Sequence, residues 1–179
     1  MRCFIAAEIP NEAKEYLAEI QKALKEKLKA KWVKKENLHI TLEFLGEIEP
    51  AAVESAKNAL EGLQEKQFDF YIQGLNCFPQ PKKARVLFAQ GKDSLPLFGI
   101  YNYIRKKTRK ITQNYKKHPF SPHITLARLK IPQDISTLLN KTPAPEALKY
   151  KINRITLFES KLEKAGPVYF KIFTKTLAE

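Results

Sequence analysis

One tetrapeptide occurs twice in the chain, and this repeat constrains the fold more than any other feature of the sequence. The residues from His39 to Leu42 spell His-Ile-Thr-Leu, and the same four residues return from His123 to Leu126. The two copies lie 84 residues apart in a chain of 179 residues, so their separation is close to half the chain. A repeat at this spacing indicates an internal duplication that forms two similar lobes related by a pseudo-twofold axis.

Each copy has the period of a β-strand, in which residues i and i+2 lie on one face. The histidine and threonine of each copy therefore share a face, while the isoleucine and leucine point to the core. With a twofold relation between the lobes, His39 and Thr41 can face His123 and Thr125 across a groove. One copy would be typical of an ordinary half-buried strand, but two copies that use two of the three histidines favour a functional site.

The rest of the chain predicts an α+β fold with antiparallel sheets, because helical and strand patterns are interspersed without strict alternation. Strands are expected over residues 2–9, 68–73, 86–89, 123–129, 149–158 and 168–174, and a polar turn at 34–37 separates apolar stretches at 32–33 and 38–45. Helices are expected over residues 12–29, 51–63, 95–110 and 132–140, with a loop at 74–83. Asn11 and Ser94 are the expected N-caps of the first and third helices.

The paired histidines and threonines suit the hydrolysis of a cyclic phosphodiester. One imidazole can take a proton from the attacking water, and the other, protonated, can give a proton to the departing ribose oxygen. An unperturbed imidazole pKa of about 6.5 makes both forms accessible near neutral pH. Thr41 and Thr125 can donate hydrogen bonds to the non-bridging phosphate oxygens, where negative charge resides in the transition state.

A cation beside the phosphate would add to this stabilisation, and Arg128 is the candidate. Arg128 follows His123 by five residues, an odd spacing that would place it on the opposite face of a regular strand. It can therefore reach the site only if a bulge or a strand end occurs near Ala127.

Other types of site fit the sequence poorly. Zinc sites need three or four ligands at characteristic spacings, but the chain has no HExxH motif, no CxxC pair and no carboxylate cluster beside the histidines. It also has no GxSxG nucleophile turn and no glycine-rich phosphate loop. Cys3 and Cys77 lie in apolar surroundings, which is typical of buried thiols in a reducing compartment. We therefore expect neither a metal nor another cofactor.

The charge balance favours a polyanionic partner. Lys and Arg number 32 against 19 Asp and Glu, which gives a net charge of +13. This positive charge concentrates polyanions near the surface, but it does not distinguish RNA from DNA, acidic membranes or small phosphates. No apolar stretch is long enough to span a bilayer, and the N-terminal apolar run is too short for a signal peptide. We therefore expect a cytoplasmic protein without a membrane partner.

The sequence around both motifs resembles the two-histidine (2H) phosphoesterase superfamily. The flanks NLHITLEFLGEI and SPHITLARL carry one His-x-Thr motif in each half of the chain. The segments RCFIAAEIP, KWVKKENLHITLEFLGEI, ARVLFA and ITLFESKLEKAGPVYF are similar to the branch of RNA 2',3'-cyclic phosphodiesterases, historically called 2'-5' RNA ligases. The resemblance covers nearly the full chain. It implies a single domain over residues 1–179, in which two intertwined lobes flank a central groove and carry helices on the outside.

The resemblance also implies an activity and a role for each site residue. The reaction is the metal-independent conversion of an RNA 2',3'-cyclic phosphate end, such as that of a tRNA fragment, to a 2'-phosphomonoester. His39 would donate a proton to the departing 3' oxygen, and His123 would accept a proton from the attacking water. Thr41 and Thr125 would bind the phosphate, and Arg128 occupies a position that is often basic in this branch. A monomer is the default expectation for an enzyme with such a groove.

Three other functions stay open. The same histidines could join RNA ends through a 2'-5' linkage, although hydrolysis should dominate unless the second RNA end is held in place of water. Another small cyclic phosphodiester could be the substrate. Alternatively, the chain could be an RNA-binding module without chemistry, whose aromatic side chains stack on bases. The residues considered for that module are Tyr101, Tyr103 and Phe120 beside Arg105, Lys116 and Lys117. Aromatic residues in such positions more often pack in a core, and the third histidine, His118, is expected to be a solvated loop residue.

Overall fold

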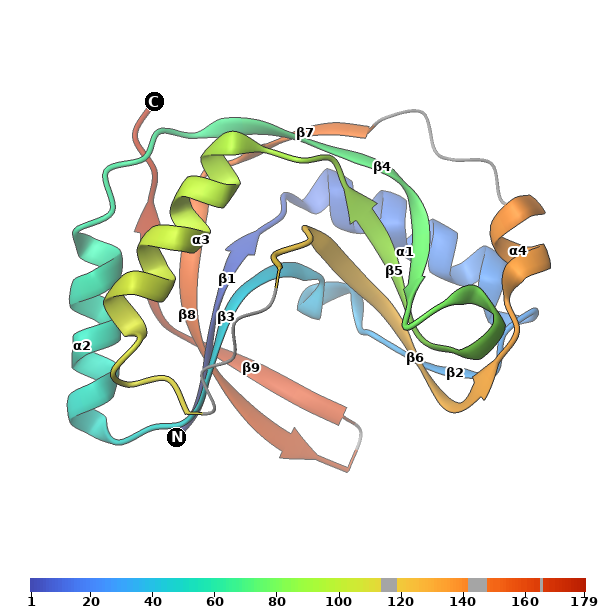
Figure 1. Cartoon of the computed structure of the whole chain (residues 1–179), viewed down its shortest axis with the longest axis horizontal. Coiled ribbons are helices and arrows are strands. Elements are labelled where there is room, and N and C mark those ends of the chain that lie inside the picture. The colour runs from blue at the N-terminus through green and yellow to red at the C-terminus, as the bar shows by residue number, and fades with distance from the viewer. Residues whose placement is uncertain (114–118, 142–147, 165) are drawn as a thin grey trace.

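The computed structural model describes residues 1–113, 119–141, 148–164 and 166–179, which form one curved nine-stranded sheet with helices packed against it (Figure 1). The strands are β1 Arg2–Glu8, β2 Ala30–Trp32, β3 His39–Glu47, β4 Phe68–Phe78, β5 Ala84–Gly91, β6 His123–Gln133, β7 Leu148–Ile152, β8 Arg154–Glu163 and β9 Gly166–Thr176. The helices are α1 Asn11–Lys25, α2 Pro50–Glu61, α3 Leu95–Thr108 and α4 Ser136–Lys141, with short 3-10 turns η1 Lys35–Asn37 and η2 Pro81–Lys83.

The sheet places the two strands that carry the repeats at its centre. The strand order is β7-β4-β5-β6-β3-β1-β8-β9, and the short β2 pairs with β6. Every neighbouring pair of these strands is antiparallel. The predicted α+β class, with antiparallel strands and a twofold duplication, is therefore confirmed.

The strand order also shows how the two halves of the chain combine. One lobe contains β3, β1, β8 and β9, and the other contains β6, β5, β4 and β7. Along the chain, β1-α1-β3-α2-β4 is followed by β5-α3-β6-α4, and then by β7, β8 and β9. β4 comes from the first half of the sequence but pairs beside β5, while β8 comes from the second half and pairs beside β1. The two halves have thus exchanged a strand.

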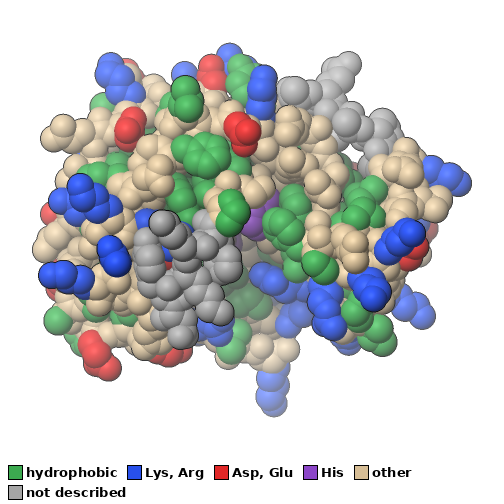
Figure 2. Space-filling model, in the orientation of Figure 1, with side chains coloured by type: hydrophobic (Ala, Val, Ile, Leu, Met, Phe, Trp, Pro, Cys, Tyr) green, Lys and Arg blue, Asp and Glu red, His purple; other side chains and the backbone are tan. Residues whose placement is uncertain are grey.

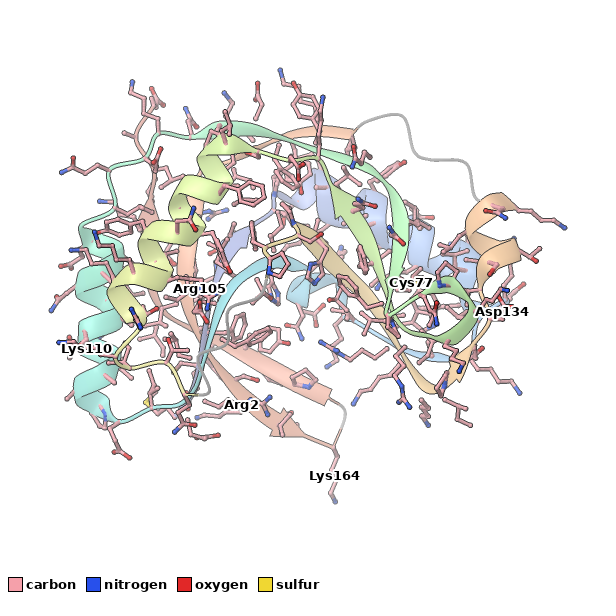
Figure 3. All side chains as sticks on the ribbon, viewed as in Figure 1. Arg2, Cys77, Arg105, Lys110, Asp134 and Lys164 are labelled. Atoms are coloured by element: carbon pink, nitrogen blue, oxygen red, sulfur yellow. The ribbon has the colours of Figure 1, made fainter. Side chains whose placement is uncertain are left out.

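The helices cover the face of the sheet that holds the core. Leu24 of α1 packs in a cluster with Leu87 of β5 and Leu129 of β6, so α1 lies against the second lobe. α2 and α3 contact each other, with α3 against β3 and α2 against β8 and β9. β8 and β9 continue beyond this core as a ribbon whose end carries Lys164 into solvent (Figures 1 and 3).

Several helix ends differ from the sequence-based expectation. α4 begins at Ser136 rather than at residue 132, because β6 continues to Gln133. α1 begins at Asn11 itself, Pro10 occupies the N-cap position without a side-chain bond, and the helix ends at Lys25 rather than at residue 29. The first helix therefore lacks the expected side-chain cap. Ser94 does cap α3, since its hydroxyl accepts a hydrogen bond from the Leu97 amide at 3.4 Å.

Two strands differ as well. The expected loop at 74–83 is strand as far as Phe78, because Gly74 (φ 155°) lies at a register shift within β4 rather than at its end. The expected strand 149–158 is two strands separated at Asn153. They lie in opposite halves of the strand order, since β7 pairs with β4 and β8 pairs with β1. Local pattern does not distinguish these cases, since the strand partners decide them.

Candidate active site

The two repeats meet where β3 and β6 pair. Ile40 and Ile124 are direct antiparallel partners, and both are fully buried in the core. Cross-strand partners point to the same side of a sheet, so the residues that flank this pair all project to the opposite face. His39, Thr41 and His123 lie there half-buried, as does Thr125. The pseudo-twofold axis therefore passes through the isoleucine pair, with one His-x-Thr pair on each side. Figure 2 shows histidine surface at the centre of one face of the molecule, next to Lys and Arg side chains.

Both repeats end in a β-bulge at their leucine. Against β1, residues 41 and 43 of β3 have partners but Leu42 has none; against β5, residues 125 and 127 of β6 have partners but Leu126 has none. Leu126 and Ala127 are consequently both buried, and Arg128 is exposed on the face from which it would otherwise be excluded. The bulge that Arg128 requires is thus present.

The equivalent position in the first lobe was missed by the sequence analysis. Phe44 precedes Arg128 by 84 residues, follows the bulge at Leu42, and is 61% exposed. An aromatic ring of this exposure is unusual beside a polar site and offers a surface on which a nucleobase can stack. The repeat offset of 84 residues would have revealed it, had it been extended beyond the four identical residues.

The two histidine rings are held in the same way. The Nδ1 atom of His39 lies 2.7 Å from the Asn37 carbonyl oxygen, and that of His123 lies 2.7 Å from the Ser121 carbonyl oxygen. A carbonyl only accepts, so Nδ1–H donates in both rings and Nε2 is the atom that gains or loses a proton. The Nε2 atom of His39 is 2.9 Å from the hydroxyl of Thr41, which donates to it when the ring is neutral.

Aromatic side chains enclose both imidazoles. The ring centroids of Phe4, Tyr169 and Phe158 lie 5.0, 5.5 and 6.3 Å from that of His39, and those of Phe88 and Phe78 lie 5.1 and 5.2 Å from that of His123. Phe4 and Phe88 are again 84 residues apart, so the aromatic support follows the duplication. Such walls restrict the rings to one orientation and limit their contact with water.

This environment favours the neutral form of both histidines. Burial lowers the pKa of His39 to about 4, and the positive charges of Lys14, His123 and Arg128 act in the same direction, against the hydrogen bond to the Asn37 carbonyl. Burial also lowers the pKa of His123, and the charge of Arg128 adds to this effect. The site is therefore electropositive and carries little charge on its own rings, so an anion bound there would raise both pKa values.

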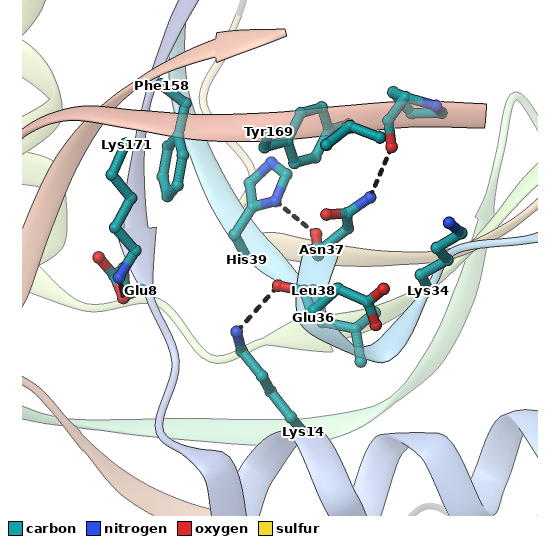
Figure 4. Close-up of a pocket in the computed structure, with 12 residues that line it drawn as sticks. Glu8, Lys14, Lys34, Glu36, Asn37, Leu38, His39, Phe158, Tyr169 and Lys171 are labelled. Carbon is teal, nitrogen blue, oxygen red and sulfur yellow. Dashed lines mark hydrogen bonds and ion pairs between the residues drawn. The ribbon is translucent and has the colours of Figure 1, made fainter. Parts of the chain in front are cut away.

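A pocket of about 350 Å³ adjoins His39 (Figure 4). Its walls come from the end of β1, α1, the segment before β3, and the β8–β9 ribbon. Apart from His39, the residues of this pocket were not singled out in the sequence, because they belong to four separate segments with no shared motif.

The aromatic residues considered for a base-stacking module are part of the packing. Tyr101 stacks on Phe120 with ring centroids 4.3 Å apart, and both pack against the main core together with Tyr103. Arg105 on α3 is 8% exposed, and its Nε lies 2.9 Å from a carboxylate oxygen of Glu43 (Figure 3). Lys116, Lys117 and His118 lie outside the described residues.

Within the described ranges, no group of three or more His, Cys, Asp or Glu side chains is arranged to hold a metal ion. Cys3 and Cys77 are both free and buried, and burial raises the pKa of each thiol. No helix in the described part of the chain is long and apolar enough to cross a membrane.

A curved antiparallel sheet that presents one His-x-Thr pair from each of two lobes defines a two-histidine phosphoesterase. A family model described as LigT-like phosphoesterase matches residues 7–88 and 96–169, a stretch in each half. The chain belongs to this family, which confirms the family predicted from the motifs.

Several known proteins are similar over nearly the whole chain. The RNA 2',3'-cyclic phosphodiesterase of Aquifex aeolicus is 33% identical, with 94% of this chain and 93% of that protein covered. The protein of that name from Thermotoga maritima is 29% identical, with 94% and 91% covered. The crystal structure of TT0787 of Thermus thermophilus has a TM-score of 0.82 at 27% identity, over 99% of this chain and 98% of that chain. Escherichia coli LigT complexed with 3'-AMP has a TM-score of 0.82 at 21% identity over the same shares, and so shares the fold.

Proposed function

We propose that the protein hydrolyses the 2',3'-cyclic phosphate end of an RNA to a 2'-phosphomonoester, without a metal. The observation that carries the proposal is the symmetric presentation of two imidazoles about the Ile40–Ile124 pair, each with Nδ1 hydrogen-bonded to a backbone carbonyl so that Nε2 is the atom that exchanges a proton. Membership of the LigT-like phosphoesterase family supports it, as do the names of the relatives in Aquifex aeolicus and Thermotoga maritima.

In the proposed reaction, Nε2 of His123 takes a proton from a water molecule as the water oxygen forms a bond to phosphorus. The bond from phosphorus to the 3' oxygen breaks, and Nε2–H of His39 gives its proton to that oxygen. The proton count is unchanged, since one ring gains what the other loses. Two groups related by a twofold axis suit this reaction, because the attacking and departing oxygens lie on opposite sides of the phosphorus.

The hydroxyls of Thr41 and Thr125 and the guanidinium of Arg128 bind the non-bridging oxygens in this proposal. The bulge before Arg128 supports its inclusion, since the residue then lies on the face of the two histidines. Phe44, at the equivalent exposed position of the other lobe, is proposed to stack on the terminal base. One side of the groove would thus neutralise the phosphate while the other holds the base.

Product analysis tests the proposal. An oligonucleotide with a 2',3'-cyclic phosphate is incubated with purified protein in the presence of EDTA, and its products are separated. We expect a 2'-phosphate end, with no 3'-phosphate and no dependence on added metal. Absence of turnover, or activity abolished by EDTA, would contradict the proposal, while a joined 2'-5' product would identify the reverse reaction.

We propose a single domain of two intertwined lobes, active as a monomer in the cytoplasm. The exchanged strands β4 and β8 support a single domain, since neither lobe has a complete set of strands from its own half of the chain. The free buried thiols of Cys3 and Cys77 suit a reducing compartment. Sedimentation analysis of the purified protein tests the monomer.

A further inference from the structure

Three lysines line the pocket beside His39 from different directions, together with aromatic and aliphatic side chains (Figure 4). Lys14 projects from α1, Lys34 from the segment before η1, and Lys171 from β9. Val168 and Tyr169 of β9 line it as well. Because His39 itself lines the pocket, a group bound there lies within one nucleotide of the phosphate that the histidines would attack.

Two carboxylates also line the pocket, but one of them is already neutralised. Glu8 is 9% exposed, accepts a 2.6 Å hydrogen bond from Thr156 and lies 2.8 Å from the ammonium of Lys171, with Arg154 at 3.9 Å. The positive charges of Lys171 on β9 and Arg154 on β8 therefore balance the negative charge of Glu8. Glu36 is exposed at the rim.

The other two lysines retain donors for a ligand. Lys14 is half-buried and gives one hydrogen bond, of 3.0 Å, to the backbone carbonyl of Glu36, which leaves two ammonium protons. Lys34 is exposed, and within the described part of the chain its ammonium has neither an ion pair nor a hydrogen bond. Burial lowers the pKa of Lys14, and the positive charges of Lys171 and Arg154 act in the same direction, against Glu8 and Glu36. An anion bound beside the ammonium of Lys14 would offset this positive charge.

The proposed chemistry gives this pocket a place along the RNA. If His39 protonates the 3' oxygen, the terminal ribose lies on the His39 side of the phosphorus and water enters from the His123 side. The RNA chain then leaves the groove from the His39 side through the 5' oxygen of that ribose. We propose that the pocket binds the phosphodiester on the 5' side of the terminal nucleotide, through Lys14 and Lys34, and thereby selects RNA ends over nucleoside cyclic phosphates. This inference rests on the proposed function.

A phosphodiester suits the pocket better than a base. The oxygens of a phosphodiester need several N–H donors close together, and ammonium groups supply such donors. Binding there would also offset the charge of Lys14, one of the groups that depress the pKa of His39. Occupation of the pocket would then favour the protonated form that the proposed acid requires, so that a 5' phosphate would increase turnover as well as affinity.

Two substrates that differ by one phosphate test the proposal. Adenosine 2',3'-cyclic phosphate and its 5'-phosphorylated form are compared at constant ionic strength. We expect kcat/KM to be at least roughly tenfold higher for the 5'-phosphorylated substrate, the scale of one charge-assisted contact. In Lys34→Gln this preference should fall several-fold, and in Lys14→Gln/Lys34→Gln it should vanish. Lys57→Gln on α2 removes the same charge from a residue that does not line the pocket, and this variant should keep the preference for the 5'-phosphorylated substrate.

The ratio of kcat/KM for the 5'-phosphorylated substrate to kcat/KM for the unphosphorylated one distinguishes the possible outcomes. Equal kcat/KM for both substrates in the unmodified protein would overturn the pocket assignment and leave the proposed function standing. A preference that survives in the double variant would also overturn it, and so would dependence on the base without dependence on the 5' phosphate. If neither substrate is hydrolysed, the proposed function fails. Calorimetric titration with adenosine 2',5'-bisphosphate against adenosine 2'-phosphate then still decides whether Lys34 contributes to anion binding.

Discussion

The rings of His39 and His123 are oriented by equivalent hydrogen bonds, from Nδ1 to the backbone carbonyl two residues earlier, but the surroundings of the two rings differ. Three aromatic rings and Lys14 surround His39, while two rings surround His123. Burial lowers both pKa values, and more strongly at His39, where the value is about 4. The unliganded site therefore holds two neutral rings at neutral pH.

The two depressed pKa values predict the pH dependence of the reaction. The active form has one ring protonated and one neutral, so kcat/KM should be bell-shaped, with limits set by the two values of the free enzyme. Both pKa values lie below 6.5, so the optimum of kcat/KM should lie on the acid side of pH 6.5 and the rate should fall as the pH rises beyond it. The bound phosphate raises both values, which should move the profile of kcat to higher pH. An optimum of kcat/KM above about pH 7.5 would contradict these surroundings.

Phe44 provides a second test at the scale of a single residue. Removal of a stacking ring should weaken substrate binding more than the chemical step, because the base is remote from the phosphorus. Phe44→Ala should raise KM for a nucleoside 2',3'-cyclic phosphate by about fivefold or more and change kcat little. Phe170→Ala is the matched control, since Phe170 is an exposed ring that directly follows the pocket residue Tyr169 and points to the other side of β9. Equal effects of both substitutions would argue against stacking on Phe44.

At the scale of elements, the position of β3 depends on a polar contact to α3. Glu43 and Arg105 form an ion pair of 2.9 Å with side chains only about a tenth exposed. Glu43→Gln leaves the Arg105 charge buried without this partner, so the free energy of unfolding should fall by about 3 kcal/mol. Glu54→Gln, which breaks the exposed pair with Lys57 on α2, should cost less than about 1 kcal/mol. Denaturant unfolding measures both, and a similar small loss in each would show that the buried pair contributes little.

The elements also show what a single sequence can predict. The motif strands and the three long helices followed from local periodicity, because each buries one face and has the matching repeat. The bulge before Arg128 could be stated only as a condition, since a bulge depends on the partner strand β5. The division between β7 and β8 was missed for the same reason, because Ile152 and Ile155 are both buried and only their different partners reveal a break.

At the scale of the whole molecule, the duplication predicted the position of the two motifs but not the exchange of β4 and β8 between the lobes. β4 pairs with the next strand along the chain, β5, but β8 pairs with the distant β1, and local patterns carry no information on such a pairing. The pocket beside His39 was unpredictable for the same reason, because α1 and β9 are far apart in sequence.

The net charge of +13 makes a prediction for the whole surface. An oligonucleotide makes several Lys or Arg contacts to phosphates, each of which releases counterions, whereas a nucleoside cyclic phosphate occupies only the groove. KM for the oligonucleotide should therefore rise steeply with salt, and KM for the mononucleotide should change little. A salt series with both substrates measures this. Equal and weak salt dependence would mean that the basic surface does not bind RNA, and would favour a small cyclic phosphodiester as the substrate.

The central claim is that one histidine from each lobe forms a single acid–base pair, and the most direct measurement is kcat for His39→Ala, His123→Ala and the double variant. Each single substitution should lower kcat by at least about 100-fold, the usual scale for a general acid or base. The double variant should be little worse than the poorer single variant, because groups that act as one unit are not additive. Thermal unfolding confirms that each variant is folded. A folded single variant that retains near-normal kcat would contradict the account.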